Sequence, residues 1–343
     1  MTASAIAAEA ADRGGAAAQA RALRAADFEL SVARDLDAVK EDWLAFEQEA
    51  AATPFQSFRW MHAWRDAVSG RKSVSPLIVT GRRRGRIAFI LPVAVERRRG
   101  VRRLVWFGHE LADYNGPLID PETLRRLPQS FVSDMLDYVR AQAPEIDHAY
   151  LTKQPETLIG LANPFARHAS VPFTCDAHSA RLEGDWESFS RAHRSTRSLR
   201  RLREKEKKLA GRGGYGFEQV DAGPERERLM DSLIAWKVDQ LAARGDRVPF
   251  ACPAIRKMVH EVARSANDPR FRLYALKSED RAVALAFCLV AQGRLIYYLC
   301  AYEDGEAARH SPGLVLLVRI FQAAFDEGLE IFDFSNGDEA YKD

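Results

Sequence analysis

Residues 294–343 read RLIYYLCAYEDGEAARHSPGLVLLVRIFQAAFDEGLEIFDFSNGDEAYKD. Aromatic and β-branched side chains crowd residues 294–301, as a half-buried strand prefers. A polar loop then leads to Ser311-Pro312-Gly313 and a long apolar run. Serine is a favoured N-cap and proline suits the first helical position. The segment therefore predicts a strand, a helix from Pro312 to about residue 327, and a second short strand at 331–334.

The start of this helix has two interpretations. Gly313 leaves the backbone bare in the first turn. A bare helix N-terminus offers unpaired N–H groups and the positive end of the dipole, which suits an anion such as a pyrophosphate. Ser-Pro-Gly taken alone favours an ordinary capped helix, and both interpretations stay open at this point.

The composition is that of a globular protein large enough for two domains. The chain has 343 residues, 47% of them hydrophobic, and a formal net charge of +2. The Ala-rich start lacks the pattern of a secretory signal and predicts a disordered tail, and no stretch predicts a membrane span. Scattered histidines and unpaired cysteine spacing predict a cytoplasmic protein without a metal site. The cysteines are Cys175, Cys252, Cys288 and Cys300.

The predicted elements follow the same order twice, β-α-α-β-β-β-α-β. Strands are expected at 28–33, 76–80, 86–95, 101–107 and 147–152, and again at 215–220, 271–277, 282–291, 294–301 and 331–334. The fold class predicted is α+β, with two tandem domains of one architecture, each a mixed sheet flanked by helices. The expected divisions are a disordered tail at 1–26, a first domain at 27–180, a basic connecting helix at 181–213 and a second domain at 214–343.

Between the two halves, residues 191–212 carry ten basic side chains on an expected helix. One face of this helix would hold Arg194, Arg197, Arg201, Lys205 and Lys208, and the leucines Leu199, Leu202 and Leu209 would lie on another. The segment is interpreted either as a solvated helix packed by its leucines or as a surface that binds an anionic partner.

Several short pieces together resemble a known family. They are Tyr297-Tyr298, Ser311-Pro312-Gly313, Asp333-Phe334, Gly337-Asp338 and Tyr341-Lys342. In this spacing they resemble the C-terminal part of the CelD-like acyltransferases, a group linked to bacterial cellulose biosynthesis. That group is a branch of the GNAT superfamily of acyl-CoA N-acyltransferases, with FemAB-like aminoacyl transferases as relatives. The phosphate loop of GNAT proteins is richer in glycine than this one, and Arg309 and Gly313 are its counterparts here.

The resemblance implies two GNAT-like domains and acetyl-CoA or another acyl-CoA as co-substrate, without a metal. In the GNAT fold two parallel strands splay apart, and the pantetheine of the donor fills the gap. The resemblance places the donor's strand at Tyr298, Leu299, Cys300 and Ala301. It places the pyrophosphate at Arg309, His310, Ser311, Pro312 and Gly313.

The catalytic candidates lie at the end of the second strand. Asp333, Asp338 and Glu339 are candidates for the general base, and Asp338 comes first because a turn after that strand should open onto the gap. A turn-forming role for Asp338 is the alternative. Tyr341 is the candidate acid, since a phenol can protonate the leaving thiolate, and Lys342 is a candidate electrostatic stabiliser.

Two further groups are expected near the acceptor. Trp236, Lys237 and Gln240 lie on the first helix of the second domain, where the resemblance places the acceptor cleft and where a plain helix surface is the alternative. Asp113, Tyr114 and Asn115, with His109, lie on a loop of the first domain that matches a CelD-like motif. Loops often carry functional residues, so this group is expected to line a cleft between the domains.

The predicted function is acyl-CoA-dependent N-acyl transfer to an amino sugar, an amino acid or a precursor of the cell envelope or of an exopolysaccharide. A non-catalytic module that docks RNA or a polysaccharide synthase complex is one alternative. Aminoacyl-tRNA-dependent transfer, with the basic helix holding tRNA phosphates, is another. The sequence has none of the Walker, GxGxxG, HExxH or GxSxG motifs, which makes hydrolase or metal chemistry a poor interpretation.

Overall fold

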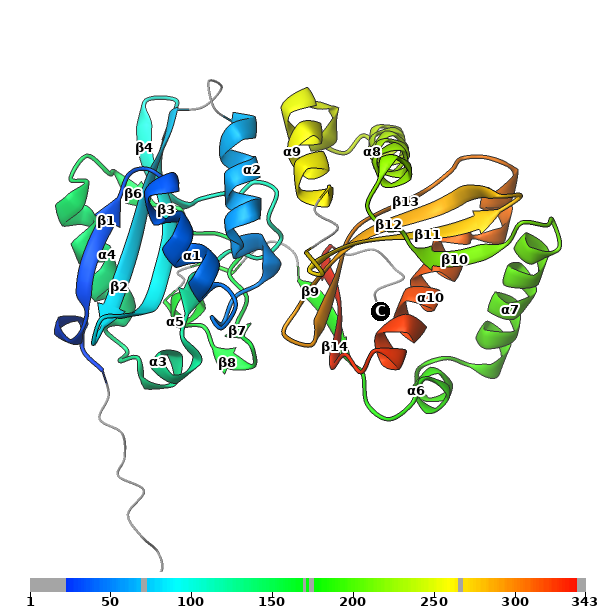
Figure 1. Ribbon diagram of the computed structural model, residues 1–343, viewed down its shortest axis with the longest axis horizontal. Coiled ribbons are helices and arrows are strands. Elements are labelled where there is room, and N and C mark those ends of the chain that lie inside the picture. The colour runs from blue at the N-terminus through cyan, green and yellow to red at the C-terminus, as the bar shows by residue number, and fades with distance from the viewer. Residues whose placement is uncertain (1–22, 69–72, 169–170, 173–175, 265–267, 338–343) are drawn as a thin grey trace, which may run out of the picture.

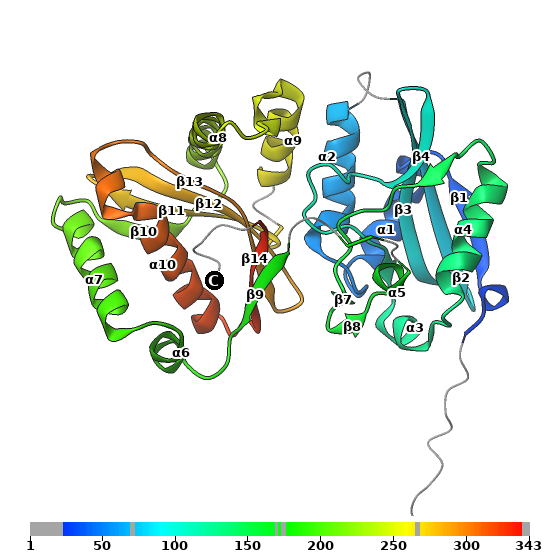
Figure 2. The same ribbon diagram turned by 180° about the vertical axis from the view of Figure 1, so that it is seen from behind.

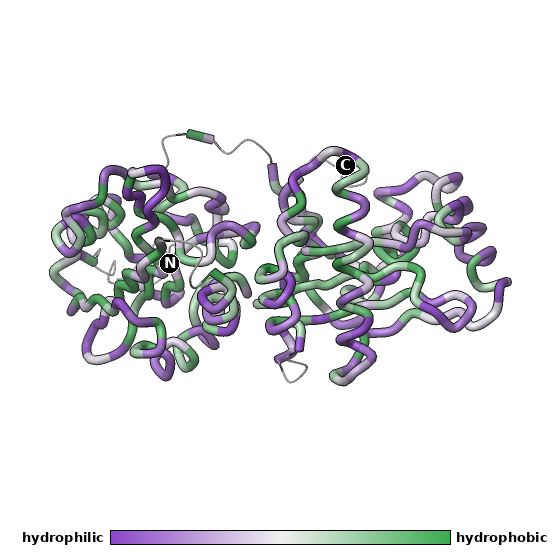
Figure 3. Tube along the Cα trace, turned by 90° about the horizontal axis from the view of Figure 1, so that it is seen from above, coloured by the Kyte–Doolittle hydropathy of each residue, from purple (hydrophilic) through white to green (hydrophobic). Residues whose placement is uncertain are grey.

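The computed structural model describes residues 23–68, 73–168, 171–172, 176–264 and 268–337. Two lobes stand side by side, each built on one sheet flanked by helices (Figure 1). The α+β fold class with two mixed sheets is therefore confirmed. Seen from above, hydrophobic positions gather in the interior of each lobe (Figure 3).

The first sheet has the strand order β1-β2-β3-β4-β6, and β5 pairs with β3. Neighbouring strands are antiparallel except β4 and β6, which are parallel. Helices α1 and α2 pack on one face of this sheet, whereas α4 and α5 pack on the other. The elements are β1 Glu29–Ala33, α1 Lys40–Phe46, α2 Phe58–Val68, β2 Ser73–Arg83, β3 Arg86–Arg98, β4 Val101–Trp106, β5 Leu118–Ile119, α3 Pro121–Arg126, α4 Phe131–Gln142, β6 His148–Ala149, β7 Thr157–Leu158, β8 Leu161–Ala162 and α5 Pro164–Arg167.

The second sheet has the order β10-β11-β12-β13-β14-β9, so its first five strands repeat the order of the first sheet. Only β13 and β14 are parallel among its described pairs. Helices α8 and α9 cover one face, and α10, α7 and α6 lie on the other (Figure 2). The elements are β9 Ala177–Arg181, α6 Trp186–His193, α7 Thr196–Ala210, β10 Gly216–Gln219, α8 Pro224–Arg244, α9 Pro253–Ala263, β11 Phe271–Ser278, β12 Arg281–Ala291, β13 Arg294–Tyr302, α10 Pro312–Asp326 and β14 Ile331–Asn336.

One apolar core runs across both lobes. Helix α2 faces α9 (Figure 1), and the buried Trp60 and Trp64 of α2 belong to the same cluster as Met258 and Val259 of α9. Burial of such side chains contributes about 1.5–3 kcal/mol each. The two halves therefore stabilise one another through shared apolar surface.

Three details differ from the sequence-based expectation. Strand β9 forms the edge of the second sheet, although residues 177–180 were expected in the first domain. The basic segment is broken at Arg194, whose backbone is extended, and α7 starts afresh where the Ser195 hydroxyl accepts from the Ser198 N–H at 3.2 Å. The packed chain starts by Leu23, which is 3% exposed and donates its N–H to the Arg126 carbonyl. Residues 1–22 lie outside the described residues.

No helix within the described ranges is both long enough and apolar enough to cross a bilayer.

Candidate functional site

Strands β13 and β14 separate after three residue pairs. Arg294, Leu295 and Ile296 pair with Ile331, Phe332 and Asp333 in parallel register. Beyond Ile296 the pairing stops, although β13 continues to Tyr302 and stays paired with β12 on its other edge. Backbone groups of β13 therefore face a gap, and such groups need partners.

A β-bulge lies where the gap opens. Phe287 pairs with Leu299 and Cys288 pairs with Tyr297, which leaves Tyr298 as the extra residue on β13. A bulge re-aims a side chain. Here the Tyr298 ring contacts Phe55 and Trp60 of the first domain, and its hydroxyl donates to the Leu111 carbonyl at 2.9 Å. Burial raises the pKa of Tyr298, so the phenol stays protonated.

The start of α10 lies beside the end of β13. Ser311 occupies the N-cap position but makes no capping bond with its side chain, because its backbone is left-handed (φ 50°). Its hydroxyl instead accepts from the Lys205 ammonium at 2.8 Å. A Cβ at Gly313 would lie 3.1 Å from the Tyr302 ring, so the bare backbone of Gly313 faces that ring. The expected hydroxyl cap at Ser311 was therefore wrong.

Basic groups of two segments surround this helix start. Lys205 and Lys208 come from α7, and Arg309 and His310 come from the short 3-10 helix Glu306–His310 that precedes α10. Arg309 is also ion-paired with Glu306. Partial burial and the charges of Arg309 and Lys208 lower the pKa of His310, which keeps the imidazole neutral near pH 7. The expected basic face and the expected phosphate loop thus meet in space.

Asp333 is fully buried at the closed end of the gap. Its Oδ1 accepts from the Tyr114 hydroxyl and from the Ser335 N–H, both at 2.7 Å. Its Oδ2 accepts from Arg294 at 2.5 Å. Both carboxylate oxygens are therefore engaged, and the arrangement favours a structural role for Asp333 over a general base. Burial and the charge of Asp333 raise the pKa of Tyr114.

The loop of the first domain contacts the second domain with two of its three expected residues. Asp113 accepts from the Ser335 hydroxyl at 2.6 Å, and its carbonyl accepts from the Asn336 amide at 2.7 Å. Tyr114 reaches Asp333. Asn115 points back into its own domain, is 2% exposed and donates to the Thr152 carbonyl. His109 is likewise buried, 4.0 Å from Glu96.

Helix α8 carries the other expected acceptor residues. The Gln240 amide donates to the Tyr302 carbonyl at 3.1 Å, which puts it at the open end of β13. Trp236 packs against the shared core, and Lys237 is half-buried. Asp338, Glu339, Tyr341 and Lys342 lie outside the described residues, so their roles stay predictions.

A large cleft of about 1720 Å³ lies between the lobes. Pro54, Tyr114 and Lys153 line it from the first domain, and Arg294 and Asp333 line it from the second. It reaches the closed end of the gap, since Arg294, Ile296 and Ile331 all border it.

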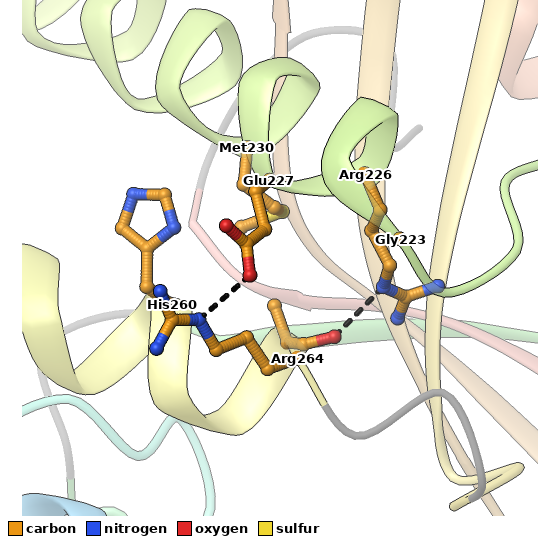
Figure 4. A pocket seen from close by; sticks show the side chains of 7 residues that line it. Gly223, Arg226, Glu227, Met230, His260 and Arg264 are labelled. Atoms are coloured by element: carbon orange, nitrogen blue, oxygen red, sulfur yellow. Dashed lines mark hydrogen bonds and ion pairs between the residues drawn. The ribbon is translucent and has the colours of Figure 1, made fainter.

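A small second pocket of about 120 Å³ lies between α8 and α9 (Figure 4). Its polar groups already have partners. Arg264 is ion-paired with Glu227 at 3.0 Å, and the buried Arg226 donates to the carbonyls of Val220, Ala263 and Phe271. This pocket is therefore a packing feature rather than a site. Within the part of the chain described, no three His, Cys, Asp or Glu side chains gather as a metal ion would require.

Sequence reasoning missed Arg294, Ser335 and Asn336. The hydrogen bonds of Ser335 and Asn336 join residues more than 220 positions apart, and nothing in the sequence pairs these positions. An arginine at a strand start and a Ser-Asn turn are ordinary features. Only the contact between the two domains gives them a role.

Comparison with known proteins agrees with this geometry. Residues 194–343 match the family model described as an Acetyltransferase (GNAT) domain. No curated protein matches the sequence. Among solved structures, the chain is similar to FemX, with a TM-score of 0.59, 10% identity, and coverage of 90% of this chain and 89% of that one. It is also similar to a conserved protein of unknown function from Bacteroides thetaiotaomicron, with a TM-score of 0.53, 10% identity, and coverage of 91% and 92%.

Residues 194–343 are thus similar to a GNAT acetyltransferase domain, and the chain as a whole has a tandem α+β fold similar to that of FemX.

Proposed function

We propose that this protein is an acyl-CoA-dependent N-acyltransferase whose donor site lies in the gap between β13 and β14. The observation that carries the proposal is the separation of the two parallel strands beside the start of α10. The amides of a pantetheine arm could pair with the backbone of β13 beyond Ile296, because no strand among the described residues pairs with that edge there. The matched GNAT domain supports the same donor.

The donor's phosphates would lie at the start of α10. The start of α10 presents the positive end of a helix dipole, which favours an anion. The Lys205 ammonium already lies 2.8 Å from the Ser311 hydroxyl, and Arg309 is exposed next to it. A cation beside a helix N-terminus suits a pyrophosphate.

The reaction transfers an acyl group from sulfur to nitrogen. The acceptor amine attacks the thioester carbonyl, the C–S bond breaks, a base takes the amine proton, and the thiolate takes a proton from an acid. A backbone N–H of β13 would stabilise the oxyanion. Asp338 is proposed as the base and Tyr341 as the acid, with Lys342 as an electrostatic stabiliser.

The proposed acceptor is an amino sugar, an amino acid or a precursor of the cell envelope or of an exopolysaccharide, as in the CelD-like branch. Asp113, Tyr114, Trp236, Lys237 and Gln240 lie on the acceptor side in this proposal. The described thiols Cys288 and Cys300 are free, which fits the proposed cytoplasmic location.

A calorimetric titration with CoA tests the donor site. We expect CoA to bind the wild type, and Lys205→Ala to weaken binding about tenfold, since a charge-assisted contact contributes about 1.5–3 kcal/mol. Lys207→Ala is the matched control, because Lys207 is exposed on the same helix and points away from Ser311. Absence of CoA binding to the wild type at millimolar concentration would reject the proposal.

Aminoacyl-tRNA is the second candidate donor, and the exposed face of α7 favours it. Arg197, Arg201 and Lys208 are all exposed there, and phosphate-rich partners bind such faces. Arg197→Glu together with Arg201→Glu should abolish tRNA binding in a gel-shift assay while leaving CoA binding intact. Tight tRNA binding, together with the absence of CoA binding, would favour aminoacyl-tRNA as the donor. RNA binding without transfer from either acyl-CoA or aminoacyl-tRNA would favour the non-catalytic module.

A further inference from the structure

Residues 111–115 of the first domain, which we call the brace, contact both strands of the gap. The Leu111 carbonyl accepts from Tyr298 at the bulge of β13. Tyr114 donates to Asp333, and Asp113 accepts from Ser335, both on β14. One short segment therefore touches β13 and β14 at the point where they part.

The brace is firmly held by its own domain. The Tyr114 carbonyl accepts from Gln56, and the Ala112 carbonyl accepts from the Lys153 ammonium, each at 2.8 Å. The Asn115 N–H donates to the Lys153 carbonyl at 2.8 Å. Hydrogen bonds to charged or buried partners are the stronger ones, so the brace is anchored to the first domain.

The brace lies in the segment of the first domain that corresponds to the proposed donor-binding segment of the second domain. The two sheets share one strand order, so β4 corresponds to β13 and β6 to β14. After β13 the 3-10 helix Glu306–His310 leads to α10, whereas after β4 a longer loop carries the brace before β5, α3 and α4. The brace thus lies in the segment that directly follows the strand corresponding to β13.

The brace closes one face of the gap. Leu111, Ala112 and Tyr114 are each at most 7% exposed. On the strands, Leu299 and Ala301 of β13 belong to the same apolar cluster as Leu111, and Ser335 of β14 is 2% exposed. Close-packed interiors leave no room for additional methylenes without displacement. An acyl group that enters the gap would therefore contact the closely packed side chains of the brace.

From this geometry we propose that the brace sets the width of the gap and restricts the donor to short acyl thioesters, with Tyr114 and Asp113 as positioning residues. The inference rests on the proposed acyl-CoA donor. It concerns the acyl end alone, because the phosphates would bind at α10, on the other face of the sheet from the brace.

The test measures dissociation constants of the full chain for CoA, acetyl-CoA and octanoyl-CoA. In the wild type we expect octanoyl-CoA to bind at least tenfold more weakly than acetyl-CoA. Asp113→Ala combined with Tyr114→Phe should reduce the ratio of the octanoyl-CoA to the acetyl-CoA dissociation constant at least threefold. The dissociation constant for CoA should stay within twofold of the wild-type value. Asp113→Asn should retain the wild-type ratio, because its amide oxygen can still accept from Ser335.

Two further variants keep the test decisive. Tyr114→Phe alone removes one hydroxyl and keeps the ring, so it preserves the fold and should shift the ratio in the same direction. Tyr215→Phe is the matched control, since Tyr215 also donates to a carboxylate, that of Glu206 on α7. It should leave the ratio unchanged.

The outcomes separate the two proposals. If CoA binds but the acyl-length ratio is equal in the wild type and the brace variants, the brace inference is overturned and the donor site stands. If the wild type binds none of the three compounds, both are overturned. A ratio that shifts with the Tyr215→Phe control as well would also overturn the brace inference.

Discussion

At the scale of single residues, Gly81 shows how tightly the first sheet is packed. A Cβ at this position would lie 2.2 Å from Cζ of Phe89, the residue opposite it on β3. The Phe89 ring cannot move aside, because Phe28 and Phe131 both pack edge-on against it at 5.1 Å. We expect Gly81→Ala to lower the free energy of unfolding by about 1–3 kcal/mol in urea denaturation.

Gly216→Ala is the matched control for this prediction. Gly216 lies on β10, and no heavy atom would come within 4 Å of its added Cβ. Its replacement should change stability little or raise it by about 0.4–1 kcal/mol. Equal stability of the two variants would contradict the packing argument.

Glu327 should make stability depend on pH. Its carboxylate accepts from both terminal nitrogens of Arg272, and these hydrogen bonds hold the pKa of Glu327 below its ordinary value of 4.5. A depressed pKa in the folded state gives stability that is present above the unfolded value and is lost as the pH falls through the folded one. The melting temperature of Glu327→Gln should therefore be below that of the wild type at pH 7, with the difference narrowing below pH 4.5.

Glu204→Gln serves as a control for this pH dependence. Glu204 is ion-paired with Arg200 on the exposed side of α7, where the Arg200 side chain is 81% exposed. Such pairs contribute about 0.3–0.5 kcal/mol. If the melting temperatures of Glu327→Gln and the wild type differ by the same amount from pH 7 to pH 3, the lost contact is not electrostatic.

At the scale of elements, the chain should bind one donor molecule rather than two. Only α10 among the described helices starts directly beside the end of a strand that has left its parallel neighbour. The corresponding segment of the first domain is occupied by the brace. Calorimetric titration with CoA should therefore give one equivalent per chain, and two equivalents would contradict this assignment.

Most elements could be predicted because local signals mark them. Proline at the first helical position predicted the start of α10 at Pro312, and the structure confirms it. Strand β9 was missed because Ala-His-Ser-Ala-Arg is short, half-exposed and lacks β-branched residues. The break before α7 had a signal in Ser195, a good N-cap, but the basic periodicity on both sides hid it.

The candidate site could be predicted less well than the fold. The strand at Tyr298 and the helix start at Gly313 follow from one continuous stretch, and the structure brings them together. The brace depends on hydrogen bonds between positions about 220 apart, which periodicity cannot reveal. Asp333 illustrates the difference, since its type suggests a base whereas its partners make it an anchor.

At the scale of the whole molecule, the two lobes should unfold together. They share one apolar core, and Arg270 of the second domain is ion-paired with the buried Glu47 of the first at 2.8 Å. Differential scanning calorimetry should show a single transition. A fragment of residues 176–343 should bind the dye ANS, because it exposes the α9 surface that α2 covers. Two separate transitions of the full chain would contradict this coupling.

The edge position of β9 has a consequence for how the protein is made. A ribosome completes β9 about 150 residues before its partner β14, whereas β10 to β13 follow one another closely. Domains generally fold as units, starting from the N-terminus, during synthesis, and pairings distant in sequence form slowly. The first lobe is therefore synthesised completely while the strands of the second are still being translated. The nascent β9 stays without its partner strand until β14 has been synthesised. The gap beside β13 therefore forms last, after the residues of the brace have been translated.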